Sequence, residues 1–192
     1  MPFRKKKTTS EILEEQKIEK FRELDEYIAE QVEKGVHTPE LADTMKASWL
    51  ATRGLYLGDS GNLDDAGNDF QEALFMSPGN VEIRICMLLY YRVLNLPENA
   101  LDIIKDTKKS YIQEASELEK IHFYKEMGNI YVMNGMNEEA LKAYNIALKR
   151  AVNSEDSINE ETQRALKAGL ELGEGINVQD EITEITALIG AL

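Results

Sequence analysis

Apolar residues recur at steps of three and four along most of this chain, the spacing that places them on one face of an α-helix. No stretch shows the alternation of apolar and polar residues that is typical of a half-buried strand. The pattern therefore predicts an all-α protein. The predicted helices cover residues 11–34, 38–58, 63–76, 81–94, 96–111, 118–134, 137–152, 157–172 and 179–189.

Capping and turn residues indicate where several of these helices begin and end. Thr8 and Glu11 are spaced as a capping box, in which the two side chains satisfy each other's free amides. Thr38 and Pro39 supply a capping hydroxyl followed by a proline at the first helical position. The Ser-Pro-Gly-Asn sequence at 77–80 ends the helix predicted before it.

The first predicted helix carries an apolar stripe on an otherwise charged surface. Its members are Ile18, Phe21, Leu24, Ile28 and Val32. Such a stripe is compatible with a coiled-coil dimer, but it spans barely two heptads, and a coiled coil needs a longer run. We therefore expect this helix to pack against the rest of its own domain.

A spacing pattern occurs twice along the chain. Its members are small or aromatic and follow one another at steps of 7, 5, 4 and 3 residues. The two sets are Gly54, Gly61, Ala66, Phe70 and Ala73, and Gly128, Gly135, Ala140, Tyr144 and Ala147. We interpret each set as two antiparallel helices whose small residues permit close crossing, with the second glycine in the turn at positive φ and the ring filling the remaining space.

These residues resemble the tetratricopeptide-repeat (TPR) signature. The matching positions in the later copy are Tyr124, Met127, Gly128, Tyr131, Gly135, Ala140, Tyr144 and Ala147. The earlier copy matches at Gly54, Ala66, Phe70, Ala73 and Pro78. It departs from the signature at Arg53, where leucine is usual, and at Leu50, where tryptophan is usual and Trp49 is adjacent.

A degenerate middle repeat is expected between these two copies. Counting the family's 34 residues onward places Tyr91, Ala100 and Ile104 suitably, with Leu88 in the glycine position and Asn95 in the turn. Ala100 and Ala140 are 40 residues apart, so about six extra residues fall near 110–120 as a loop or a lengthened helix.

The resemblance implies a TPR α-solenoid, a right-handed superhelix of antiparallel helix pairs with flanking helices at both ends. We expect a disordered basic tip at 1–10 and an N-terminal capping helix with the start of the first repeat helix at 11–46. The three repeats would occupy 47–152, as 47–80, 81–114 and 119–152, and capping helices would occupy 153–192. The last of these has Ile182, Ile185, Leu188 and Ile189 on one face, and we expect it to dock onto the stack rather than insert into a groove.

In the family, the first helix of each repeat lines a concave binding face, and its inward positions can be counted from the glycine position. The resulting positions here are Ala51, Leu55 and Gly58, then Ile85, Leu89 and Arg92, then Lys125, Asn129 and Val132, with His122 near the rim. This predicts a groove that is apolar in its first two repeats and polar at its other end. A TPR subclass clamps a terminal carboxylate with Lys and Asn in its first repeat, and Ala51 and Leu55 disfavour that here. In the alternative, these residues merely pack inside the stack.

Charge and chemistry-bearing residues narrow the classes of function. The net charge of −13 disfavours nucleic acid as the main partner, although Arg4, Lys5, Lys6 and Lys7 are suited to a weak contact with an anionic surface. The one cysteine, Cys86, lies in an apolar run and is expected to be a small buried side chain. We find no metal-ligand spacing around His37 or His122 and no catalytic or cofactor motif, so we expect neither an enzyme nor a bound metal or cofactor.

The sequence therefore predicts a cytoplasmic protein-interaction module, an adaptor or chaperone-like scaffold that holds an apolar or amphipathic peptide segment of a partner. No unbroken apolar run suits a signal peptide or a membrane span. The alternative is a structural protein that forms homo-oligomers by docking its terminal helices onto neighbouring copies.

Overall fold

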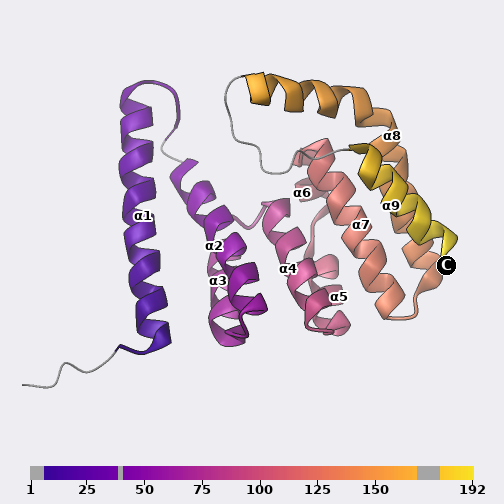
Figure 1. Ribbon diagram of the computed structural model, residues 1–192, viewed down its shortest axis with the longest axis horizontal. Helices are drawn as coiled ribbons and strands as arrows, with labels where there is room; N and C mark the ends of the chain where they lie inside the picture. The colour runs from indigo at the N-terminus through magenta and orange to yellow at the C-terminus, as the bar shows by residue number, and fades with distance from the viewer. Residues whose placement is uncertain (1–6, 39–40, 168–177) are drawn as a thin grey trace, which may run out of the picture. The chain divides into compact units, whose positions relative to one another are not determined.

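The computed structural model describes residues 7–38, 41–167 and 178–192, with 160–167 described by backbone alone. Every regular element in these ranges is an α-helix, which confirms the all-α prediction (Figure 1). The helices are α1 (Thr9–Glu33), α2 (Leu41–Asp59), α3 (Leu63–Met76), α4 (Val81–Val93), α5 (Pro97–Asp106), α6 (Lys109–Glu114), α7 (Glu117–Met133), α8 (Asn137–Lys167) and α9 (Val178–Gly190).

The chain divides into two compact units, Met1–Gly79 and Asn80–Leu192. The first contains α1 to α3 and the second contains α4 to α9. The division falls in the turn that the sequence places between the first two repeats.

Helices α2 and α3 of the first unit form a tight pair. A Cβ atom added to Gly54 would lie 3.0 Å from Cζ of Phe70, so the Phe70 ring lies directly against the α2 backbone. Ala66 and Ala73 of α3 are fully buried beside this contact. The small residues therefore make room for the ring, as the spacing predicts.

Arg53 departs from the TPR signature, and its contacts supply a reason. Its Nε and Nη2 atoms each donate to the buried carboxylate of Asp69 at 2.6 Å, and its Nη1 donates to the Leu13 carbonyl of α1 at 2.8 Å. Arg53 thus joins all three helices of the unit through one guanidinium. A leucine at this position would leave the carboxylate of Asp69 buried without its partner.

Helix α1 begins with the predicted capping box, in which the Thr8 amide donates to Glu11 and the Glu11 amide donates to Thr8. Its apolar stripe is partly different from the prediction. Ile28 is buried, but Ile18 is 61% exposed. The neighbouring Lys17 faces inward instead, and its Nζ atom lies 3.1 Å from Oε2 of Glu72 in α3.

Helices α7 and α8 of the second unit repeat the α2–α3 packing. A Cβ atom at Gly128 would overlap the ring of Tyr144, while Ala140 and Ala147 are fully buried. In the degenerate pair α4–α5, Leu88 and Ala100 are both buried in the same cluster of apolar side chains. The turns of the three pairs also agree, because Gly61, Asn95 and Gly135 have φ of +81°, +55° and +70°.

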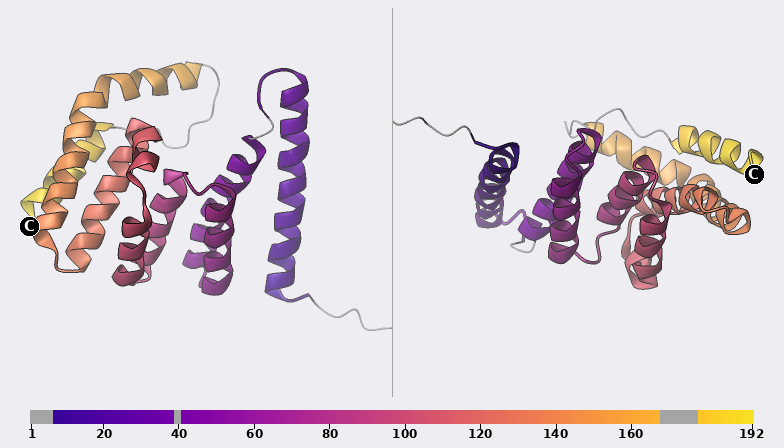
Figure 2. Two further views of the ribbon diagram at one scale, coloured as in Figure 1. Left: turned by 180° about the vertical axis from the view of Figure 1, so that it is seen from behind. Right: turned by 90° about the horizontal axis from the view of Figure 1, so that it is seen from below.

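Two element boundaries differ from the prediction. The helix predicted over 96–111 ends at Asp106, and the extra residues form the separate short helix α6. The helices predicted over 137–152 and 157–172 are one continuous helix to Lys167, which bends along its length (Figures 1 and 2). Residues 153–156 are polar but contain neither proline nor glycine, so nothing in them stops a helix. Residues 168–172 lie outside the described residues.

Candidate functional site

The predicted groove positions of the first unit lie on α2. Leu55 and Gly58 are half-buried, whereas the side chain of Ala51 is fully buried. Of these three positions, Ala51 therefore offers no side-chain surface to a partner in this structure.

In the second unit, α4 and α7 pack side by side and present most of the remaining positions. Ile85 is buried in the cluster that also holds Leu88, Phe123 and Ile130, and Leu89 is half-buried against it. One turn beyond Leu89, Val93 is 65% exposed. Along this face of α4, the apolar side chains thus become more exposed from Ile85 to Leu89 to Val93.

A polar band crosses the α4–α7 surface. Arg92 Nε donates to Glu126 Oε2 at 2.8 Å, which ties the predicted groove position on α4 to α7. Asn129 Oδ1 accepts a hydrogen bond from the Tyr144 hydroxyl at 2.7 Å, and burial raises the pKa of Tyr144 to about 12. Val132 lies one turn further along α7 and is 40% exposed. Leu89, Arg92, Asn129 and Val132, here called the α4–α7 face, are therefore accessible together with Val93.

Helix α9 covers the two other predicted positions on α7. Lys125 Nζ lies 2.6 Å from Glu181 and 3.0 Å from Glu184, and His122 Nε2 lies 3.4 Å from Glu181. Hydrogen bonds from His122 and from Lys125 lower the pKa of Glu181 to about 2, so this carboxylate is ionised at neutral pH. Lys125 and His122 are consequently held by the chain's own C-terminal helix.

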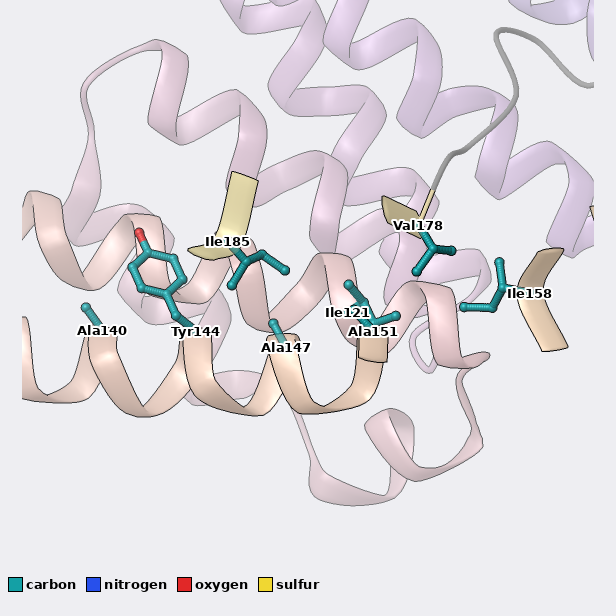
Figure 3. Close-up of a cluster of buried hydrophobic side chains, with 8 residues drawn as sticks. All are labelled: Ile121, Ala140, Tyr144, Ala147, Ala151, Ile158, Val178 and Ile185. Atoms are coloured by element: carbon teal, nitrogen blue, oxygen red, sulfur yellow. The ribbon is translucent and has the colours of Figure 1, made fainter. Parts of the chain in front are cut away.

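Apolar contacts fix α9 in this position. Val178 and Ile185 are fully buried against Ile121 of α7 and the alanines of α8, and the Tyr144 ring lies in the same cluster (Figure 3). The sequence predicts that this helix docks onto the stack rather than into a groove. It does dock by its apolar face, but it lies over the predicted groove positions Lys125 and His122. The sequence did not predict that Glu181 and Glu184 reach Lys125. The available signal was their spacing, since acids three apart next to the apolar stripe lie on one edge of the helix.

The described cysteine, histidine and acidic residues form neither a reactive thiol nor a metal-binding cluster. Burial raises the pKa of the Cys86 thiol to about 11, so it is protonated at neutral pH and a poor nucleophile. Across 7–38, 41–159 and 178–192, no three His, Cys, Asp or Glu side chains are placed to hold a metal ion. None of the helices described is both long and apolar enough to cross a membrane.

The predicted basic tip lies mostly outside the described residues, which include Lys7 but not Arg4, Lys5 or Lys6. Lys7 forms an ion pair with Glu15 of α1.

Comparison with protein-family models, with curated proteins and with solved structures finds no match to this chain.

Proposed function

We propose that this chain is a protein-interaction module of the TPR class, which binds an apolar or amphipathic segment of a partner on the α4–α7 face. The observation that carries the proposal is the shared packing of α2–α3 and α7–α8. In both pairs a glycine of the first helix lies against an aromatic ring of the second, and two alanines of the second are buried beside it. Stacked helical pairs of this kind expose one helix of each pair along a continuous binding face.

The α4–α7 face has the chemistry expected of a helix-binding surface. Leu89 and Val132 supply apolar contacts. Arg92 and Asn129, each within one turn of one of them, supply hydrogen-bonding groups. An amphipathic helix binds such a surface through apolar residues at helical spacing, with its polar residues directed toward the rim. Because α9 occupies Lys125 and His122, the partner's contacts in this unit fall on α4 and the later half of α7.

The terminal helices also favour partner binding over self-assembly through those helices. Ile28 of α1 is buried in the first unit, and Ile185 of α9 is buried in the second. The apolar face of α9 is thus used within its own chain, and that of α1 is used in part, since Ile18 is exposed.

Affinity capture followed by mass spectrometry tests the proposal. A partner retained by the native chain should be lost with Leu89→Glu, because a carboxylate on the apolar part of the face opposes burial of the partner. Val132→Glu gives a second variant at a more exposed position. Val152→Glu on α8 is the matched control, since it adds the same charge at an exposed valine away from the face. Retention of every captured partner by folded Leu89→Glu and Val132→Glu would exclude this face.

A further inference from the structure

A recess of about 560 Å³ opens in the second unit between α5, α6, α7 and α8. Its apolar wall consists of Ile104, Ile112, Phe123 and Met127, which belong to or pack on the cluster shared by α4, α5 and α7. Small-molecule sites have volumes of about 300–1,000 Å³, mostly apolar walls and a few polar groups that orient the ligand. This recess has that size, but its lining is about evenly divided between apolar and polar residues.

One wall of the recess is made by residues that are additional to the regular 34-residue repeat. Helix α6 (Lys109–Glu114) corresponds to the extra residues predicted near 110–120, and it contributes Lys109, Ile112 and Gln113 to the recess. The connection between the two earlier pairs, from α3 to α4, is the short turn at 77–80 and has no equivalent helix. The recess therefore depends on a feature that the repeat architecture itself does not require.

The rim of the recess is cationic although the chain as a whole carries −13. Lys109, Lys120 and Arg150 line it together with one acid, Glu117. Glu117 accepts from Lys120 at 2.9 Å and from Arg150 at 2.7 Å, and these hydrogen bonds lower its pKa. Glu117 is thus ionised and already shared, which leaves an excess of two positive charges at the rim.

The guanidinium of Arg150 has unused hydrogen-bonding capacity. Its Nη1 atom donates to Glu117, while its buried Nε atom has no acceptor among the residues described. The exposed side chain of Lys109 forms no ion pair within the described part of the chain. An ionised acceptor placed between these groups would gain charge-assisted hydrogen bonds.

We propose that this recess binds a small amphipathic carboxylate, a ligand with one acidic head and an apolar body. The head lies between Lys109, Lys120 and Arg150. The body lies on the half-buried side chains of Ile104 and Met127. Only two net positive charges are available, so one carboxylate suits the rim better than a polyphosphate. This site shares no residue with the α4–α7 face, so the assignment does not depend on the proposed function.

Calorimetric titration of the full chain with decanoate tests the assignment, with decanol as the probe that keeps the apolar body and lacks the charge. We expect decanoate to bind at least about tenfold more tightly than decanol. Lys109→Glu should weaken decanoate binding about tenfold or more and leave decanol binding unchanged. Lys142→Glu is the control, because it makes the same charge change at an exposed lysine of α8 that does not line the recess.

Equal affinity of Lys109→Glu and Lys142→Glu for decanoate would overturn the proposal, as would no decanoate binding up to about 1 mM. A third probe distinguishes the source of the carboxylate. Tighter binding of a short peptide ending in leucine, lost when its carboxylate is amidated, would assign the recess to a polypeptide end and overturn its assignment to a small molecule.

Discussion

Individual glycines and rings determine how closely the helix pairs approach. Gly54 and Gly128 occupy matching places, and each lies against the aromatic side chain sixteen residues later, Phe70 or Tyr144. Within a helix, glycine normally costs about 1 kcal/mol relative to alanine. Glycine at these two places is therefore explained by the space it leaves for the ring, rather than by helix stability.

Gly128→Ala should lower the free energy of unfolding by about 1–3 kcal/mol, because the added methyl overlaps the Tyr144 ring in a packed core. Gly67→Ala should raise it by about 0.5–1 kcal/mol, since Gly67 is helical and open space surrounds its Cβ position. Denaturant unfolding followed by circular dichroism measures both. Equal stabilisation by the two substitutions would contradict the close contact at Gly128.

The sequence predicts the positions of the helices and of the α1 cap better than it predicts the contacts between helices. The repeat spacing places Asn95 in a turn and Ala100 at a small-residue position. In the structure Asn95 has a positive φ and Ala100 is buried, because turns and close crossings restrict which residue types fit. The continuity of α8 was not predicted, since polar residues at 153–156 are compatible with either a loop or an exposed helix. Periodicity also assigns Lys125 to a face of α7 without indicating what covers it. The contact with α9 is a tertiary one, made 56 residues away in sequence.

The docking of α9 should depend on pH through Glu181. The pKa of this carboxyl is about 2, below its ordinary value of 4.5, so its stabilising contribution is complete well above pH 4.5 and disappears as the pH falls toward 2. At neutral pH, Glu181→Gln should lower the free energy of unfolding by about 1–3 kcal/mol. The difference in the free energy of unfolding between Glu181→Gln and the native chain should become smaller as the pH falls. Denaturant unfolding at several pH values measures this.

Asp180→Asn provides the control for that comparison, because Asp180 is an exposed acid on the same helix. Hydrogen exchange of the α9 amides adds a local readout. A pH-independent difference between Glu181→Gln and the native chain would contradict the ion-pair account of α9 docking.

For the whole molecule, the division into Met1–Gly79 and Asn80–Leu192 predicts two levels of cooperativity. Most contacts of α1, α2 and α3 lie within the first unit, so local unfolding should spread inside it before it reaches the second. The bidentate pair of Arg53 with buried Asp69 is a sensitive point of the first unit. Removing one partner of such a pair leaves an uncompensated buried charge.

Asp69→Asn should therefore lower the opening free energy of amides in α2 and α3 by about 3–5 kcal/mol, measured by native-state hydrogen exchange. Amides of α7 and α8 should change much less. Gly128→Ala should have the reverse distribution. Equal loss of protection throughout the chain after either substitution would show that the two units unfold as one.

The backbone on either side of α6 is extended, at Thr107 and Lys108 before it and at Ala115 after it. Neither junction needs a glycine or a positive φ, and no helix-to-helix crossing of the repeat type depends on the segment between them. The exposed residues of α6 can thus be exchanged for protein engineering, provided that Tyr111 and Ile112 are kept, because these two pack in the apolar cluster of the second unit. Such exchanges would alter the wall of the recess while leaving the contact of Gly128 with Tyr144 untouched.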